Sequence, residues 1–200
     1  MSLSIIIITK NEEAQIKDCL ESVRFADEII LVDSGSTDKT LSIARAYATR
    51  IIETDWKGYS GTKMIALEAA TGDWILWLDA DERVQPSLQE EIREVTKRGA
   101  VTGYYIARKA IFLGRWIKHC GWYPGYVIRL FKKEGARFSE NLVHESVYID
   151  GPTAHLKFPL IHYTDTSLDH YFIKFNKYTT LAARELFQSN YSCHLTDLIG

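Results

Sequence analysis

The sequence predicts an α/β fold of three layers, in which helices cover both faces of a mixed, mainly parallel β-sheet. Short apolar runs alternate with amphipathic stretches through the first hundred residues, which is typical of βαβ units. One of these runs, residues 74–78, is apolar throughout, as expected of a strand buried on both faces inside a parallel sheet. From residue 103 onward aromatic and basic residues alternate, which predicts mixed or antiparallel strands.

The elements follow in order along the chain. Strands are predicted at residues 3–9 and 29–32, from Ile51, from Trp74, and at residues 104–106, 126–131 and 159–161. Helices are predicted from about Glu13, from Thr37 or Asp38, over residues 64–70, from Pro86 to Lys97, and along an apolar stripe from Leu168 to Leu186. A loop is expected at residues 58–61.

Size and charge limit the range of functions. A chain of 200 residues, of which 46% are hydrophobic, can bury one core, so residues 1–200 are expected to form a single domain. Residues 1–100 carry 12 basic and 18 acidic side chains, a net charge of −6, whereas residues 101–200 carry 12 and 8, a net charge of +4. Neither half is basic enough to predict nucleic acid as a partner.

Cysteine usage and hydropathy indicate the compartment. Cys19, Cys120 and Cys193 lie far apart without the spacing of a metal site, which favours a reducing compartment over a disulfide framework. The chain starts without the basic segment of a signal peptide, and no stretch approaches the ~20 apolar residues that cross a bilayer. A cytoplasmic protein is therefore expected.

Carboxylates end the strand predicted from Trp74. Asp79 and Asp81 follow this buried run directly, so they are expected at the carboxyl edge of the sheet, where open α/β sheets bind ligands. Two carboxylates two residues apart can hold a hard divalent cation. The alternative is that these acidic residues cap the helix that begins near Pro86.

Two other predicted strands also end in polar clusters. Residues 9–12 follow the first strand, and residues 33–38 follow the second. If the three strands are parallel, their ends meet at one edge of the sheet, which is harder to obtain by chance than one acidic pair. Gly35 permits a tight turn, and the hydroxyls and carboxylates around it can accept hydrogen bonds from a base or ribose. Neither a P-loop nor a dinucleotide-binding glycine motif is present.

The chain resembles glycosyltransferase family 2, the inverting nucleotide-sugar enzymes of GT-A fold. The resemblance rests on residues 5–12, 33–38 and 74–82, whose order and spacing are specific. Together with residues 121–122, 129–131 and 143–145, these motifs are similar to those of the bacterial lipopolysaccharide core β-glycosyltransferases, of the type that glucosylates an inner-core heptose. Members of that group usually continue well past residue 200, so a further C-terminal segment is expected.

The resemblance implies a site for a nucleoside diphosphate sugar, for which UDP-glucose is expected, and for Mg²⁺ or Mn²⁺. It assigns donor contacts to Thr9, Glu12, Asp33, Ser36, Lys63 and Asp79, and metal ligation to Asp79 and Asp81. His162 is a further candidate for a metal or phosphate contact. For His162, a structural role at the end of an apolar strand is the alternative. A cation at Asp81 would stabilise the charge that develops on the departing nucleoside diphosphate.

The resemblance makes residues 1–100 the nucleotide-sugar half and residues 101–200 the acceptor half. Glu145 is the candidate base that takes a proton from the acceptor hydroxyl, and His144 would orient it or touch the acceptor. A surface glutamate and a structural histidine are the alternatives. Separately, Arg129 and Lys132 are candidates for binding a donor phosphate or an acidic acceptor, with solvated side chains as the alternative.

Residues 108–118 mix cations with large apolar side chains. Contact with an anionic membrane surface, at the inner face of the inner membrane, would explain this composition and suit a lipid-linked acceptor. An active-site flap or a packed hairpin is the alternative. The aromatic face of the final helix is interpreted as core or as an oligomer contact.

The predicted activity is metal-dependent transfer of a hexose to a saccharide hydroxyl with inversion, in lipopolysaccharide core or other cell-envelope glycan biosynthesis. A nucleotidyltransferase would use similar metal ligands, but it would show a glycine-rich basic loop near the first strand. A non-catalytic nucleotide-sugar-binding protein would bind the donor without hydrolysis or transfer.

Overall fold

The computed structural model describes residues 1–139 and 147–188, except for the side chain of Glu185. Its strands are β1 (Leu3–Thr9), β2 (Glu28–Asp33), β3 (Arg50–Glu53), β4 (Trp74–Asp79), β5 (Glu82–Arg83), β6 (Gly103–Phe112), β7 (Arg115–Trp116), β8 (Gly125–Lys132), β9 (Arg137–Phe138), β10 (Val147–Tyr148), β11 (Thr153–His155) and β12 (Leu160–Asp165). Its helices are α1 (Ile16–Ser22), α2 (Thr40–Ala44), α3 (Gly58–Ala69), α4 (Pro86–Arg98) and α5 (Leu168–Gln188).

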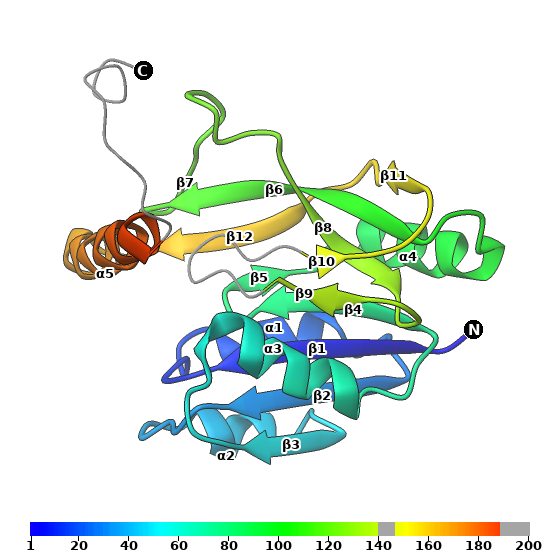
Figure 1. Cartoon of the computed structure of the whole chain (residues 1–200), viewed down its shortest axis with the longest axis horizontal. Helices are drawn as coiled ribbons and strands as arrows, with labels where there is room; N and C mark the ends of the chain where they lie inside the picture. Colours follow the sequence, from blue (N-terminus) through cyan, green and yellow to red (C-terminus); the bar gives the residue numbers. More distant parts are fainter. Residues whose placement is uncertain (140–146, 189–200) are drawn as a thin grey trace.

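One large sheet runs through the molecule (Figure 1) in the strand order β3-β2-β1-β4-β8-β6-β12-β5. Strands β7 and β11 also pair with β6, and β9 and β10 form a separate small sheet. The four strands from the first half of the chain, β3, β2, β1 and β4, are parallel to one another. Strand β8 is antiparallel to both β4 and β6, so the sheet is mixed as the sequence predicts.

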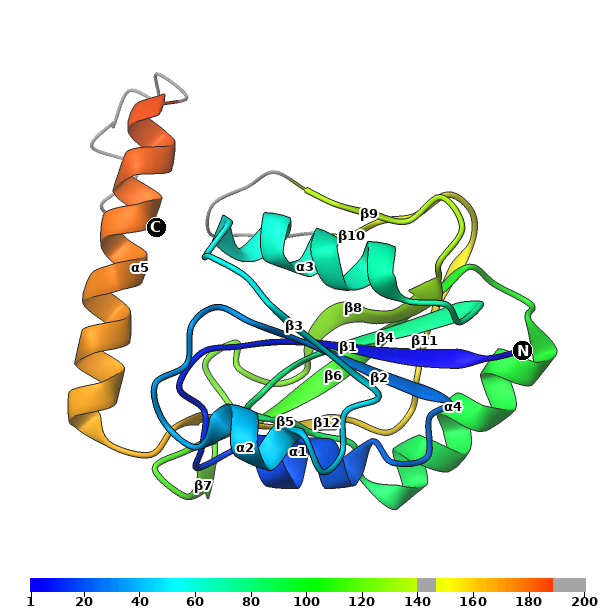
Figure 2. The same cartoon turned by 90° about the horizontal axis from the view of Figure 1, so that it is seen from below.

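Helices cover both faces of the sheet, with α3 on one face and α1, α2 and α4 on the other (Figure 2). Because side chains alternate along a strand, β4 supplies both cores. Trp74 and Leu76 belong to the core that includes residues of α1 and α4, and Ile75 and Trp77 belong to the core that includes residues of α3. The predicted burial of residues 74–78 on both faces is therefore confirmed.

The second half of the sheet curls back toward β4. Only Ala80 and Asp81 separate β4 from β5 along the chain, yet β8, β6 and β12 lie between these two strands in the sheet. Strand β5 pairs antiparallel with β12, where His162 is the partner of Glu82. The curl therefore brings the end of β12 beside the turn that follows β4.

A β-bulge interrupts the pairing of β8 with β6. Leu130 pairs with Tyr104 and Ile128 pairs with Tyr105, so Arg129 is the extra residue on β8. Bulges re-aim side chains locally. This one places a buried arginine in the middle of an otherwise apolar strand.

Two expectations from the sequence need correction. The loop predicted at residues 58–61 is wrong, because α3 begins at Gly58 and the hydroxyl of Thr62 donates to the Gly58 carbonyl at 2.7 Å. Burial of Ala66 and Leu67 in the core stabilises this helix despite the two glycines in its first turn. The helix-cap alternative for the acidic run is also wrong, since Asp81 and Glu82 precede a short strand and α4 starts only at Pro86.

Helix α5 stands at the edge of the molecule (Figure 2). Its apolar side chains are largely exposed, since Phe172 is 55%, Phe175 50% and Phe187 83% exposed. The interpretation of this face as part of the core is therefore wrong. Contacts to the body include those of Tyr171 with Phe112. Among the residues that the structure describes, no helix combines the length and apolar character needed to cross a bilayer.

Candidate active site

The carboxyl ends of β1, β2 and β4 lie side by side. Thr9 pairs with Asp33, and Ile8 pairs with Asp79. Since all three strands run in the same direction, the polar residues that follow them share one edge of the sheet. The spatial prediction made from the sequence is confirmed.

Side-chain hydrogen bonds hold together the loops that follow β1 and β2. Asp33 Oδ2 accepts from the backbone N–H groups of Gly35 at 2.9 Å and Ser36 at 2.8 Å, and Ser36 Oγ donates to Asp33 Oδ1 at 2.5 Å. The Asn11 N–H donates to Ser36 Oγ at 2.8 Å. Asp33 is fully buried, and its three hydrogen bonds fix the turn at Gly35. The φ of Gly35 is +83°, which suits glycine.

The turn between β4 and β5 places Asp81 against β12. Its Oδ2 lies 3.4 Å from His162 Nε2, and the Tyr163 N–H donates to the Asp81 carbonyl at 2.9 Å. The buried guanidinium of Arg83 fixes this turn to the start of α1 by donating to the Gln15 carbonyl at 2.7 Å. Asp81 and His162, far apart in the sequence, thus form one pair.

Arg129 joins two carboxylates from β4 and β5. Its Nη2 donates to Asp79 Oδ2 at 2.6 Å and to Glu82 Oε1 at 2.8 Å, and its Cζ lies 3.4 Å from the centre of the Trp77 ring. The side chains of Arg129 and Glu82 are 1% and 0% exposed. The solvated alternative for Arg129 is therefore wrong, and its guanidinium is bound to carboxylates of the chain itself.

Helix α3 adds a second buried cation to this group. Lys63 Nζ lies 3.9 Å from Asp79 Oδ1 and 3.9 Å from the centre of the Trp77 ring. A cation therefore lies beside each carboxylate oxygen of Asp79: Lys63 beside Oδ1 and Arg129 beside Oδ2. The Asp79 side chain is still 34% exposed, so Asp79 lies where the buried network meets solvent.

The carboxylates at this edge change one another's ionisation. Burial, together with the charges of Asp81, Asp38 and Asp79, raises the pKa of Glu12 to about 7, although Lys174 opposes the change. Burial also opposes ionisation of Asp79, but Arg129 and Lys63 hold the pKa of Asp79 well below its usual value. The edge therefore concentrates negative charge, which Arg129 and Lys63 offset at Asp79.

Several buried polar atoms at this edge have no hydrogen-bond partner. Among the described residues these include Thr9 Oγ1, Ser34 Oγ and Asp81 Oδ1, and also Nε and Nη1 of Arg129. Buried polar atoms are paired in the great majority of cases, so each exception calls for an explanation. Atoms of this kind that gather at one sheet edge are suited to bind a polar ligand.

Residues at this edge offer a partial set of ligands for a divalent cation. Across residues 1–139 and 147–188, no three histidine, cysteine or acidic side chains are arranged to hold a metal by themselves. Magnesium sites, however, commonly use one or two carboxylates together with substrate phosphates and water. The unpartnered Oδ1 of Asp81, with His162 beside it, fits such a partial ligand set.

The structure brings most of the predicted site residues to this edge. Thr9, Glu12, Asp33, Ser36, Lys63, Asp79, Asp81 and His162 all lie in or directly after the elements that meet there. Glu145 and His144 lie outside the described residues. Sequence reasoning missed the pairing role of Glu82 and Arg129. The signal was a charged residue inside the apolar run of β8.

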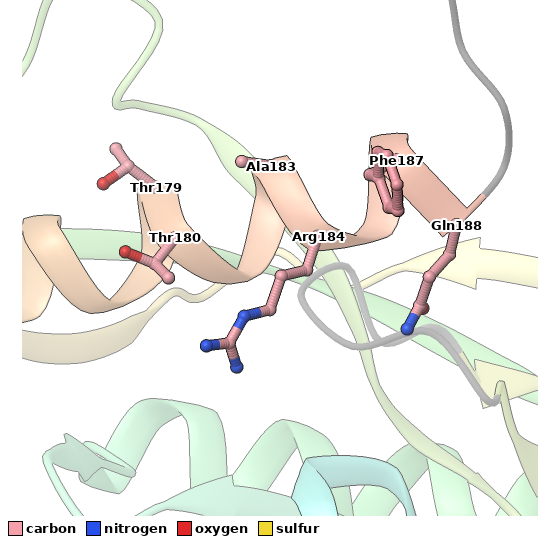
Figure 3. A pocket seen from close by; sticks show the side chains of 6 residues that line it. All are labelled: Thr179, Thr180, Ala183, Arg184, Phe187 and Gln188. Carbon is pink, nitrogen blue, oxygen red and sulfur yellow. The ribbon is translucent and has the colours of Figure 1, made fainter.

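Two hollows lie outside the shared edge. One, of about 500 Å³, is lined only by residues of α5, including Arg184 and Gln188, which extend from the same side of the helix (Figure 3). None of its lining residues is a predicted site residue. The other, of about 390 Å³, includes His162 and Arg108 in its lining, so it adjoins the Asp81 pair.

Comparison with protein families gives one match to more than half of the chain. The family model described as Glycosyl transferase family 2 matches residues 4–149. The lipopolysaccharide core biosynthesis glycosyltransferase LpsC of Rhizobium meliloti is 32% identical, over 94% of this chain and 73% of its own length. A glycosyltransferase of Rickettsia bellii is 34% identical, over 92% of this chain and 67% of its own length.

Solved structures show the same fold at lower identity. Mannosyl-3-phosphoglycerate synthase from Rubrobacter xylanophilus has a TM-score of 0.63 and 15% identity, and the match covers 98% of this chain and 77% of that one. S. aureus TarS 1-349, in complex with UDP-GlcNAc, has a TM-score of 0.61 and 18% identity over 84% of this chain. The match spans 60% of that TarS chain. These neighbours show a GT-A-like fold.

Replacement of Arg129 should test the buried network. Arg129→Met leaves Glu82 as an unpaired buried carboxylate, so we expect the free energy of unfolding at pH 7 to fall by about 3–5 kcal/mol. Chemical denaturation measures the loss. The matched control is Arg98→Met, which breaks an exposed pair with Glu94 and should cost less than about 1 kcal/mol.

The double variant Glu82→Gln/Arg129→Met separates pairing from packing. Because it removes both charges, its loss should be smaller than the sum of the two single losses. If the loss of the double variant equals the sum of the two single losses to within about 0.5 kcal/mol, the two side chains do not stabilise one another, which would contradict the buried network.

Proposed function

Because the chain belongs to glycosyltransferase family 2, we propose that it transfers a hexose from a nucleoside diphosphate sugar to a saccharide hydroxyl, with inversion at the anomeric carbon. The observation that carries the proposal is the shared edge of β1, β2 and β4, where buried polar atoms of Thr9, Ser34 and Asp81 lack partners. Residues 1–100 would bind the donor, and residues 101–200 the acceptor.

The donor would lie across the ends of β1 and β2. Thr9 and Glu12 would contact the nucleoside directly, whereas Asp33 and Ser36 would act mainly by fixing the loop that receives it, since their side chains bond within that loop. The ammonium group of Lys63 would stabilise the negative charge of the diphosphate. Its position 3.9 Å from Asp79 suits this role.

Asp81 and His162 would hold the divalent cation, with Asp79 beside them. Asp79 Oδ1 is the oxygen better placed for the cation or the ribose, because Oδ2 already binds Arg129 at 2.6 Å. Mg²⁺ or Mn²⁺, when bound, supplies positive charge opposite the leaving diphosphate. Glucosyl-3-phosphoglycerate synthase from Mycobacterium tuberculosis, a fold neighbour with a TM-score of 0.58, has been crystallised with Mn²⁺ and UDP.

Glu145 would act as the base. It would take the proton of the acceptor hydroxyl as that oxygen attacks the anomeric carbon from the face opposite the diphosphate. The bond between the anomeric carbon and the diphosphate oxygen breaks, and the nucleoside diphosphate leaves. His144 would orient Glu145 or touch the acceptor.

We propose UDP-glucose as donor and a lipopolysaccharide inner-core saccharide as acceptor. The similarity to LpsC supports the acceptor class, and the UDP-GlcNAc bound by TarS supports a uridine nucleotide. A nucleotidyltransferase would instead consume a nucleoside triphosphate and release pyrophosphate. A non-catalytic binding protein would bind the donor and leave it intact, so an assay of donor turnover separates both from the proposal.

Membrane contact is proposed for the surface formed by the β6–β7 hairpin and the start of α5. Phe112 contacts Tyr171, so these two elements lie together. Exposed Leu113 and Phe172 supply apolar side chains, and the exposed cation Lys118 suits an anionic lipid surface. Such contact at the inner face of the inner membrane would bring a lipid-linked acceptor to the site.

Replacement of the proposed metal ligand Asp81 should abolish most of the metal-dependent activity. Asp81→Asn should lower metal-dependent donor turnover by at least about a hundredfold, because the lost carboxylate stabilises charge in the transition state. Release of UDP from UDP-glucose with Mg²⁺ or Mn²⁺ measures the loss. Asp150→Asn removes an exposed carboxylate before β11, at the opposite edge of the sheet, and should leave turnover unchanged. Full activity of Asp81→Asn would refute the metal role.

Replacement of the proposed base should spare donor binding. Glu145→Gln should bind UDP as tightly as the wild-type chain, but its transfer rate should fall by about 10²–10⁴-fold, the usual contribution of general base catalysis. Titration calorimetry and single-turnover transfer measure the two quantities. Glu134→Gln is the control, since Glu134 is exposed. Unchanged transfer in Glu145→Gln would move the base elsewhere.

Vesicle binding should depend on the hairpin cations. The chain should float with vesicles that contain phosphatidylglycerol and remain in solution with vesicles of phosphatidylcholine alone. The double variant Arg115→Gln/Lys118→Gln should bind anionic vesicles about thirtyfold more weakly, at about 1 kcal/mol for each cation. Equal binding to both kinds of vesicle, or no effect of the variant, would rule out this contact.

A further inference from the structure

The hollow of about 390 Å³ beside His162 has the size and lining of a ligand site. Volumes of roughly 300–1,000 Å³ are usual for small-molecule pockets. The lining residues come from β6, from the loop before β8, from β8 itself and from β12; they are Arg108, Ala110, Cys120, Gly121, Trp122, Gly125, His162 and Thr164. The lining combines one aromatic surface with a few polar groups, and none of these residues is acidic.

The sheet register explains why space exists at this place. Gly125 on β8 pairs with Arg108 on β6, so the position opposite the arginine carries no side chain. On the other side of β6, His162 pairs with Ala110, whose methyl group is small. Two small residues therefore leave room between the Arg108 guanidinium and the His162 imidazole.

Arg108 is partly buried but has no partner among the described residues. Its guanidinium makes no hydrogen bond or ion pair with any residue that the structure describes. The two other arginines that are not exposed are both paired: Arg129 binds two carboxylates, and Arg83 binds carbonyl oxygens. A partly buried arginine without an anion is suited to bind a phosphate or carboxylate from outside, because its planar fork matches both groups.

Trp122 supplies the apolar part of the hollow. Its side chain is 38% exposed and packs edge-on against Phe112 at 5.9 Å between ring centres, so the indole is held in place. Aromatic walls of this kind pack against the apolar faces of sugar rings. The combination of Trp122 and Arg108 fits a sugar that carries an acidic group, and neither residue alone would specify one.

We propose that this hollow binds the acceptor and that Arg108 selects a saccharide bearing a phosphate or carboxylate group. The inference rests on the proposed glycosyl transfer, since it makes this ligand the acceptor. His162 joins the two parts: it lines the hollow and lies 3.4 Å from Asp81 at the donor edge. An anionic acceptor is also consistent with the net charge of +4 in residues 101–200.

Cys120 provides a direct readout, because it is exposed and lines the hollow, whereas Cys19 is fully buried. In a Cys193→Ser background, the rate at which a maleimide labels Cys120 is measured with glucose 6-phosphate, glucuronate or glucose. Both anionic sugars should slow labelling at concentrations at which glucose has no effect. Inorganic phosphate should protect less well than glucose 6-phosphate.

Arg108→Gln should weaken the protection at least about tenfold, the value of one charge-assisted hydrogen bond, and Arg108→Lys should retain part of it. Arg45→Gln, at an exposed arginine after α2, is the charge-matched control. In this variant the anionic sugars should protect Cys120 as well as they do in the chain without the substitution. Equal protection by glucose, equal protection by inorganic phosphate, or full protection in Arg108→Gln would overturn the proposal.

A separate measurement on the wild-type chain distinguishes the two levels of inference. UDP with Mn²⁺ should raise the melting temperature if the donor site is as proposed. If this shift occurs and the anionic sugars give no protection, the Arg108 inference alone fails. If UDP and Mn²⁺ give no shift in the melting temperature, the proposed donor site is wrong, whether or not the anionic sugars protect Cys120.

Discussion

The parallel pairing of β1 with both β2 and β4 is the constraint on which the site depends. It sets Thr9 beside Asp33 and Ile8 beside Asp79, so that three loops from separate parts of the chain begin at one edge of the sheet. A slip of one residue in β4 would exchange its two faces and move Trp77 out of the core under α3. Burial of β4 on both faces therefore fixes the position of the acidic turn that follows it.

The second half of the sheet is tied to this edge by charge as well as by hydrogen bonds between strands. The bulge on β8 directs Arg129 to Asp79 and Glu82, and the curl of the sheet carries His162 to Asp81. Burying Glu82 is costly unless a cation accompanies it, so the network is stable only when β4, β5 and β8 are all in place. The shared edge of β1, β2 and β4 and the proposed acceptor hollow are thus packed together.

The sequence was sufficient for features that depend on local pattern. Apolar runs such as residues 74–78 predicted the buried strands, and their polar ends predicted the shared edge. Features that depend on distant partners were not accessible: the role of Arg129 follows from a bulge and from carboxylates 47 and 50 residues away. Residues 58–61 were misassigned because tertiary burial outweighed the low helix propensity of glycine. Glu145 stays a prediction.

The central claim is that a nucleoside diphosphate and a divalent cation bind together at the edge that holds Asp81. It is tested most directly by titration calorimetry of the wild-type chain with UDP at several fixed concentrations of Mn²⁺, and with Mn²⁺ at several fixed concentrations of UDP. The account predicts that each ligand tightens the binding of the other by the same factor, within about 5–150-fold. Independent binding of UDP and Mn²⁺ would contradict it.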